Sequence, residues 1–344
     1  MAGPAGGPVD PGGRRPGHAP GRATRRHAGG PGLPVSAGRV VVAVVGATAT
    51  GKSDLAIALA HELDGEVVNA DAMQLYRGMD IGTAKLTAAE RQGVPHHLLD
   101  VLDVRQEATV AAYQREVDAV LADVLGRGRV PVVVGGSGLY VRAALDVLEI
   151  PPTDAGVRAR LEDESRTVGA LALHARLAEL DPPSAARILP SNARRVVRAL
   201  EVIELTGRPF SATLPEPVYR RPSVQLGLRA PRPELDQRIE RRVHRMWDDG
   251  LLAEVRRLLP QGLREGRTAG RAVGYAQAVG QLDGSLDEAA AQAQTAQLTR
   301  RLVRRQESWF GRDERIAWLP YDGPDLVEQA LAAVRAGRSA PRAG

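Results

Sequence analysis

The sequence predicts an α/β fold: a parallel-sheet core flanked by helices, with an inserted domain made of helices alone. Three observations lead to this prediction. In the first half of the chain, short β-branched runs alternate with amphipathic helical stretches, as they do in parallel sheets. Over 153–215 the strand-like runs disappear and the periodicity is helical throughout. One further strand-like run, 224–228, precedes a mainly helical stretch that begins at Glu234.

Residues 1–38 form a tail rich in glycine, proline and arginine, with Asp10 as its single acid. This composition cannot bury enough apolar surface to offset the entropy of ordering, so we predict a disordered basic tail. We expect an inert extension; the alternative is a weak, salt-sensitive attraction to RNA.

The ordered core begins abruptly at Arg39. Its first strand is expected at 40–45, a valine-rich run typical of a strand buried on both faces. A helix over 53–63, a strand over 66–69, a helix over 109–126 and a strand over 130–134 follow in the first part of the core, 39–152. The predicted helical insertion is 153–215. The rest of the core, with C-terminal helices, is expected over 216–325, and a C-terminal tail over 326–344.

Composition narrows the functional classes. The 344 residues carry a formal net charge of +5 and no cysteine, which excludes disulfides, thiol nucleophiles and Cys-based metal sites. No apolar run is long enough to cross a membrane and no secretory signal is evident, so we expect a cytoplasmic protein. All basic residues except Lys52 and Lys85 are arginines, whose planar fork suits phosphate groups. The basic balance permits a nucleic-acid partner without requiring one.

The clearest motif lies between the first expected strand and the helix after it. It matches the pattern G-x-x-x-x-G-K-[ST] of a phosphate-binding P-loop, and its residues are Gly46, Ala47, Thr48, Ala49, Thr50, Gly51, Lys52 and Ser53. The backbone N–H groups and the helix N-terminus favour anions, Lys52 adds a point charge, and Ser53 is placed to ligate Mg²⁺. The motif therefore predicts a diphosphate-binding site in a P-loop NTPase-like core.

The P-loop alone does not identify the reaction. Most such loops serve ATP or GTP, so ATP binding stays open. The strand at 130–134 ends in two glycines, with no acid to hold a metal. Asp71, just beyond the strand at 66–69, could be the base of a small-molecule kinase.

Several further blocks resemble one family. The blocks 71–85, 95–100, 135–140, 271–275 and 299–309 occur in the order found in the tRNA dimethylallyltransferases, also called tRNA isopentenyltransferases, and the resemblance spans about 40–320. It implies transfer of the dimethylallyl group from dimethylallyl diphosphate to N6 of adenosine 37, next to the tRNA anticodon. It also implies Mg²⁺ as cofactor, the anticodon stem-loop as partner, and a monomer.

The resemblance also suggests roles for individual residues. Asp71 would be the general base, since a poorly basic exocyclic amine gains from a carboxylate that accepts its proton. Ser137 stands where the family has a threonine and keeps the hydroxyl group. Arg242 resembles an arginine near the diphosphate. Ala72 replaces a common serine, which puts only a secondary contact in doubt.

Residues expected to contact tRNA fall into several groups. A basic surface around the site is required because the target base must be splayed out of its loop. Arg300, Arg301, Arg304 and Arg305 are spaced to lie on one side of a helix, as a rail for phosphates, although each cluster could be a solvated face. The complete set is Asp71, Ala72, Met73, Gln74, Ser137, Arg158, Arg194, Arg195, Arg198, Arg271, Gly274, Tyr275, Arg300, Arg304, Arg305, Gln306 and Trp309.

Two alternatives to the transferase stay open: a P-loop kinase with Asp71 as base, and a non-catalytic RNA-binding protein with a relic loop. A kinase does not need the arginine clusters, and a relic would have lost Lys52 or Asp71. The adjacent pair His96 and His97 is expected to be structural, because neighbouring side chains point apart and no acid cluster completes a metal site.

Overall fold

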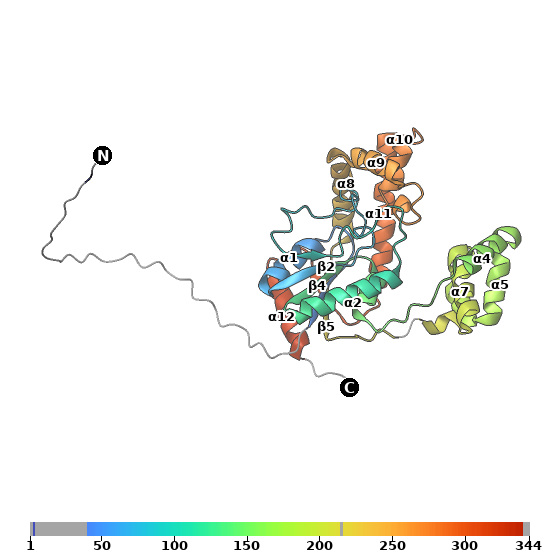
Figure 1. Cartoon of the computed structure of the whole chain (residues 1–344), viewed down its shortest axis with the longest axis horizontal. Helices are drawn as coiled ribbons and strands as arrows, with labels where there is room; N and C mark the ends of the chain where they lie inside the picture. Colours follow the sequence, from blue (N-terminus) through green and yellow to red (C-terminus); the bar gives the residue numbers. More distant parts are fainter. Residues whose placement is uncertain (1–2, 4–39, 214–215, 340–344) are drawn as a thin grey trace. The chain divides into compact units, whose positions relative to one another are not determined.

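The computed structural model describes residue 3, residues 40–213 and residues 216–339. The tail predicted to be disordered, 1–38, lies outside the described residues apart from Gly3. Within the described part, the predicted α/β architecture is confirmed: a parallel sheet in the order β3-β2-β4-β1-β5-β6 is flanked by helices (Figure 1). Its strands are β1 Val41–Gly46, β2 Gly65–Asn69, β3 His96–His97, β4 Val130–Gly135, β5 Ser223–Arg229 and β6 Ile316–Pro320.

The valine run predicted as a central strand forms β1, which lies between β4 and β5 and is buried along its whole length. Its alternate side chains enter two cores on opposite faces of the sheet, as expected for a strand of period two. Helices α2 (Val110–Gly126) and α3 (Gly138–Leu145) cover one face. Helices α1 (Lys52–Glu62) and α12 (Leu326–Ser339) cover the other (Figure 1).

Two parts of the sheet region differ from the prediction. The expected C-terminal tail, 326–344, is a helix over most of its length, because Ala330 and Val334 of α12 are buried against the sheet. The edge strands β3 and β6 were also missed. Strand β3 has only two residues, and β6, with the sequence IAWLP, has no polar side chains to alternate with its apolar ones, so neither shows period-two alternation.

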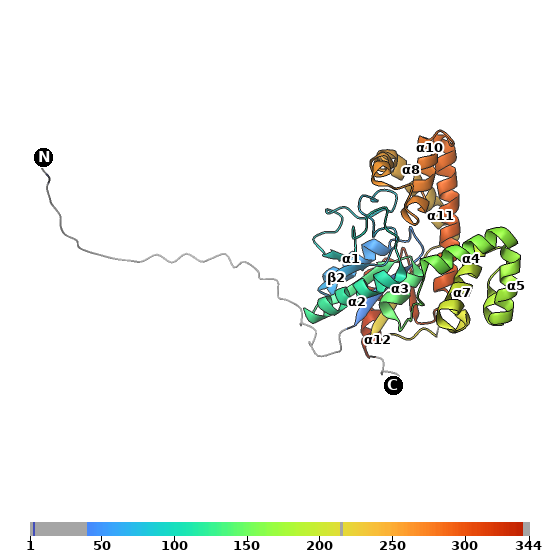
Figure 2. The same ribbon diagram turned by 45° about the vertical axis from the view of Figure 1, so that its right-hand side comes forward.

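The stretch after Pro152 is helical, with α4 Ala155–Val168, α5 Ala170–Leu180, α6 Pro182–Arg187 and α7 Ala193–Thr206, followed by a 3₁₀ turn, η1 Phe210–Thr213. Figure 2 shows α4, α5 and α7 packed together. They enclose a core of their own, in which Leu161, Leu173 and Val196 are buried. Helix α4 is capped by Asp154, whose carboxylate accepts a hydrogen bond from the Val157 amide.

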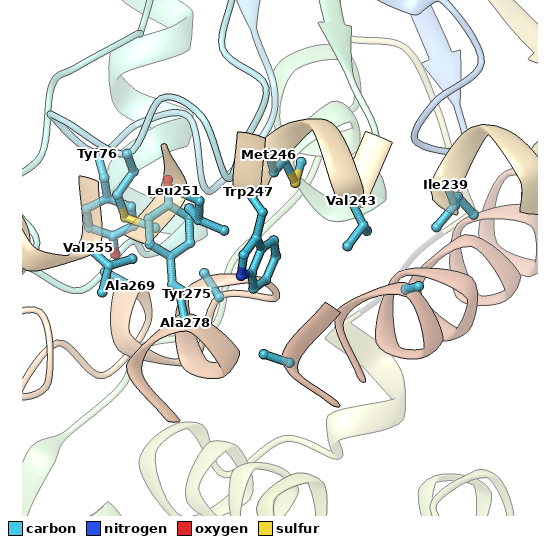
Figure 3. Close-up of a cluster of buried hydrophobic side chains, with 14 of the residues drawn as sticks. Tyr76, Ile239, Val243, Met246, Trp247, Leu251, Val255, Ala269, Tyr275 and Ala278 are labelled. Atoms are coloured by element: carbon cyan, nitrogen blue, oxygen red, sulfur yellow. The ribbon is translucent and has the colours of Figure 1, made fainter. Parts of the chain in front are cut away.

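A fourth core lies among the helices that follow β5. These are α8 Arg232–Asp248, α9 Leu251–Leu258, α10 Tyr275–Leu282 and α11 Glu288–Phe310, with 3₁₀ turns η2 Leu259–Gln261 and η3 Ala269–Arg271. Helices α8 and α11 lie side by side, and their core also encloses Tyr76 and Met79 from the loop after β2 (Figure 3). This core therefore joins the C-terminal helices to the loop that carries Asp71.

Candidate active site

Three loops meet at the carboxyl ends of the neighbouring strands β1, β2 and β4, where ligands bind in open parallel sheets. The P-loop follows β1, Asp71 follows β2, and Ser137 follows β4. The amide of Ala72 donates a hydrogen bond of 3.4 Å to the Ser137 hydroxyl oxygen, which joins the second and third loops. Residues far apart in the sequence are thus brought together by strand order.

The P-loop is held by its own hydrogen bonds. Gly46 has a φ of 130°, and a Cβ at this position would lie 2.8 Å from the Leu228 carbonyl oxygen, so only glycine fits. The carbonyl oxygen of Ala47 accepts hydrogen bonds from the Thr50 hydroxyl, at 2.8 Å, and from the Lys52 ammonium, at 2.5 Å. Because α1 begins at Lys52, the amides around it form the helix N-terminus, which favours bound anions.

Lys52 is a half-buried cation with a lowered pKa. Its pKa is lowered to about 8, mainly by removal of the ammonium from water; the carboxylate of Asp71 opposes the shift and the charge of Arg242 adds to it. Lys52 thus stays mostly protonated at neutral pH and is partly removed from water. A desolvated cation of this kind binds a diphosphate more strongly than a solvated one.

Asp71 is fixed by a small network at the end of β2. Its amide donates to Asn69 Oδ1 at 2.9 Å, and its own Oδ1 accepts from the Met73 amide at 2.9 Å. Asn69 is buried and donates in turn to the Leu98 carbonyl oxygen. No residue in the described part of the chain donates a hydrogen bond to Oδ2 of Asp71, so this oxygen can accept a proton from a substrate.

Two cavities share Asp71. The P-loop cavity, of about 870 Å³, is lined by Lys52 and Ser53 among others. The outer cavity, of about 1020 Å³, is lined by Ser137 and by arginines of the helical insertion. Residues that line both are Thr48, Asp71, Thr83, Arg242 and Met246. Asp71 therefore lies where a ligand in one cavity would meet a ligand in the other.

One face of α8 supplies cations to the P-loop cavity. Arg242, the member predicted from the sequence, donates to the Thr48 hydroxyl at 3.3 Å and to the Thr83 carbonyl oxygen at 3.4 Å. Its pKa is lowered by burial, although Asp71 opposes the shift. The arginines that the sequence analysis missed are Arg238, Arg241 and Arg245. Arg238, Arg241 and Arg245 follow one another at steps of three and four residues, which is the spacing of one helical face, and the sequence alone could have revealed it.

Gln306, expected to contact tRNA, lines the outer cavity and also has partners within the protein. It is buried; its Oε1 accepts from the Thr48 amide of the P-loop at 3.0 Å, and its Nε2 donates to the Gly136 carbonyl oxygen at 3.0 Å. Gln306 thus joins α11 to the loops after β1 and β4. A Cβ at position 136 would collide with this side-chain amide, so glycine is the residue that fits there.

Tyr275, Gly274 and Arg300, also expected to contact tRNA, have surroundings within the protein that the structure defines. Tyr275 and Gly274 are buried, and the Tyr275 hydroxyl donates to Glu254 at 2.5 Å. Arg300 forms an ion pair with Glu240 of α8, so it joins two helices. The α11 residues that line the outer cavity are Thr295, Thr299, Leu302 and Gln306, none of them an arginine. Arg304, Arg305 and Trp309 are exposed outside both cavities.

The other predicted tRNA contacts lie in or beside the cavities. Arg194 and Arg195 are exposed and line the outer cavity, as does Arg271. Ala72 and Met73 line it as well. Gln74 instead lines the P-loop cavity and donates to the Thr83 carbonyl oxygen at 3.1 Å.

Two further arginines line the outer cavity while bound to one carboxylate. Arg158 and Arg198 both donate to Glu201 Oε2, at 2.7 and 2.8 Å. The side chain of Glu201 is completely buried. Burial alone would raise its pKa, but hydrogen bonds from Thr153, Arg158, Arg198 and a backbone amide hold the pKa at about 2.

The donor set for a metal is small. The described residues contain no group of three or more His, Cys, Asp or Glu side chains that could hold a metal ion. Ser53 lines the P-loop cavity beside Asp54 and Asp71. This set fits Mg²⁺ bound mainly through substrate phosphates and water, as in other phosphate sites. His96 and His97 form β3; His96 Nδ1 lies 2.8 Å from the Val94 carbonyl oxygen and His97 Nε2 lies 2.6 Å from Glu66, so both have structural partners.

The fold and the two cavities define a protein with a P-loop-type α/β core, in which the phosphate-binding loop lies beside a cavity lined by arginines. A family model described as IPP transferase matches residues 74–313. The tRNA dimethylallyltransferase of Thermobifida fusca is 64% identical over 299 residues, which cover 86% of this chain and 94% of that protein. The one from Kineococcus radiotolerans is 61% identical, covering 84% and 94% of the two chains.

Solved structures agree with these relatives. The tRNA isopentenylpyrophosphate transferase of Bacillus halodurans is 37% identical, with a TM-score of 0.66 over 88% of this chain and 97% of that one. A eukaryotic dimethylallyltransferase, captured acting on tRNA, has a TM-score of 0.72 at 26% identity, covering 87% and 78%. The chain belongs to the IPP transferase family, the tRNA dimethylallyltransferases. Among the described residues, no helix is long and apolar enough to cross a membrane.

Proposed function

We propose that this enzyme transfers the dimethylallyl group of dimethylallyl diphosphate to N6 of adenosine 37 in tRNA. The diphosphate binds in the P-loop cavity, and the anticodon stem-loop presents its base in the outer cavity. The observation that carries the proposal is the position of Asp71, which lines both cavities. One chain lines both cavities, so the proposed site needs no second copy.

The reaction balances with the groups present. The bond between the allylic carbon and the diphosphate oxygen breaks, and a bond forms between that carbon and N6 of the adenine. The proton of N6 passes to the carboxylate of Asp71, and diphosphate leaves. Lys52 and Arg242 stabilise the negative charge that develops on the leaving group.

Mg²⁺ would be held by the substrate phosphates and the hydroxyl of Ser53, and when bound it would supply additional positive charge at the leaving group. Ser137 is the N-cap residue of α3, and its hydroxyl lines the outer cavity, where it can form a hydrogen bond with the incoming nucleotide. Arg194, Arg195 and Arg271 lie where tRNA phosphates would pass.

The test uses dimethylallyl diphosphate labelled in the isoprenoid and unmodified tRNA. We expect label in the tRNA without ATP consumption. Asp71→Ala should lower the transfer rate by about 10²-fold or more while leaving tRNA affinity within about twofold. Consumption of ATP with no labelled tRNA would favour the kinase alternative. Transfer at the wild-type rate in Asp71→Ala would show that Asp71 is not the base.

A further inference from the structure

A buried carboxylate in α9 holds the wall of the P-loop cavity. Oε2 of Glu254 accepts hydrogen bonds from the amides of Asp80 and Ile81, at 3.1 and 2.9 Å, and Oε1 accepts from the amide of Gly82, at 3.4 Å. The fourth donor is the hydroxyl of Tyr275, at 2.5 Å. Glu254 is only 1% exposed, and its four donors satisfy the hydrogen-bonding needs of a carboxylate removed from water.

Tyr275 supports the same segment by packing. Figure 3 shows its ring among Tyr76, Leu251 and Val255 in the core formed by the C-terminal helices. A Cβ on Gly82 would collide with this ring, so the backbone at residue 82 lies directly against it. The phenol therefore fixes Glu254 through its hydroxyl and the backbone of residue 82 through its ring.

The held segment, 80–83, faces the proposed donor. Asp80, Ile81 and Thr83 line the P-loop cavity. The carbonyl oxygen of Thr83 accepts hydrogen bonds from Arg242 and Gln74. Two hydrogen-bonded steps thus connect Tyr275 to the backbone beside Arg242, a cation at the cavity in which the diphosphate is proposed to bind.

We propose that Tyr275 and Glu254 are positioning residues that set segment 80–83 and, through Thr83, the guanidinium of Arg242, and so determine affinity for the donor diphosphate. Neither residue touches tRNA. This inference rests on the proposed use of the P-loop cavity for a diphosphate. It gives Tyr275 a role different from the tRNA contact that the sequence predicts for it.

Apolar packing could not do the same work. A leucine in place of Glu254 would fill the space but could not select the orientation of three amides. A carboxylate with four directed donors has one favourable arrangement, and it leaves those donors unpaired if it moves. The position of segment 80–83 is therefore specified by hydrogen bonds rather than by volume.

The experiment compares Tyr275→Phe with the matched control Tyr219→Phe. Tyr219 is a half-buried tyrosine; its hydroxyl accepts a hydrogen bond from Gln225 at 2.9 Å, and it lines neither cavity. Binding of inorganic pyrophosphate is measured by calorimetry, and binding of unmodified tRNA is measured separately. We expect Tyr275→Phe to weaken pyrophosphate binding by about fivefold or more, with tRNA binding within about twofold of wild type. Tyr219→Phe should change neither.

Every other result overturns the inference. Weaker tRNA binding with unchanged pyrophosphate binding would make Tyr275 part of the tRNA surface. A lower melting temperature with both affinities unchanged would make it a purely structural residue. Gly82→Ala, which moves the same segment from the other side, should weaken pyrophosphate binding in the same direction. Because binding is measured without turnover, failure of wild-type prenyl transfer would refute the proposed function and leave the positioning test intact.

Discussion

Replacing Glu201 with glutamine should destabilise the helical insertion by an amount that the structure allows us to work out. The carboxylate accepts hydrogen bonds from Thr153, the Asp154 amide, Arg158 and Arg198, and these hold its pKa at about 2 against an ordinary value of 4.5. At about 1.4 kcal/mol per pH unit, that difference corresponds to about 3 kcal/mol at neutral pH. Glutamine would lose this and would place an amide donor against two guanidinium groups.

The pH dependence gives this prediction its sign. Because folding lowers the pKa of Glu201, its stabilisation is fully present above pH 4.5 and is lost as the pH falls through about 2. The difference in unfolding free energy between wild type and Glu201→Gln should therefore shrink by about 1.4 kcal/mol between pH 6 and pH 3.5. Other carboxylates titrate in this range too, but they are common to both proteins and cancel.

The assay is urea denaturation followed by circular dichroism at several pH values, with hydrogen exchange locating the loss in α4–α7. The matched control is Glu204→Gln, three residues along α7, where an exposed glutamate pairs with Arg160. Exposed ion pairs contribute about 0–1 kcal/mol to stability, so Glu204→Gln should change the unfolding free energy by little. A difference below about 1 kcal/mol for Glu201→Gln at pH 7, or one independent of pH, would refute the reasoning.

Three further predictions concern the cavities. Since burial lowers the pKa of Lys52 to about 8, the affinity for pyrophosphate should fall as the pH rises through 8. Lys52→Arg should remove that decline, because arginine stays charged. A wild-type affinity that stays constant up to pH 9.5 would show that Lys52 does not bind the diphosphate as a cation. Gly136→Ala should displace Gln306 from the P-loop and slow transfer by about tenfold, whereas Gly126→Ala, which has open space around it, should not; equal rates would show that the tether is dispensable. Replacing Arg194 and Arg195 by alanine should weaken tRNA binding. The slope of log affinity against log salt concentration should fall by about one for each phosphate that is no longer neutralised. An unchanged slope would show that tRNA binds elsewhere.

The parts of the site that could be predicted from the sequence are those that depend on nearby residues. The P-loop is a contiguous motif, and its context between a strand and a helix is visible in the pattern of valines and the helix after them. Asp71 could be placed because it directly follows a strand, and strand ends in a parallel sheet share one edge. The arginines on one face of α8 are also close together in the sequence, and their helical spacing near Arg242 would have predicted them.

The roles of Tyr275, Gln306 and Arg300 could not be predicted because they depend on distant partners. Gln306 bonds an amide 258 residues away in the sequence, and Tyr275 bonds a carboxylate on a different helix. A motif marks residues that matter without showing whether they face a ligand or the interior. The four-residue spacing of the arginines on α11 was correct, but the acids of α8 that take up Arg300 come from another element.

Beside each cavity, a buried glutamate accepts hydrogen bonds from backbone amides that come earlier in the sequence. Glu254 binds the amides of 80–82 beside the P-loop cavity, and Glu201 binds the amide of Asp154 at the start of the insertion. Their remaining partners differ: Glu254 has only neutral donors, whereas Glu201 also holds two arginines of the outer cavity. A carboxylate paired with arginines keeps those cations oriented and leaves a net positive charge for RNA phosphates. One with neutral donors fixes the backbone without tying up a cation, which leaves Lys52 and Arg242 available for a diphosphate.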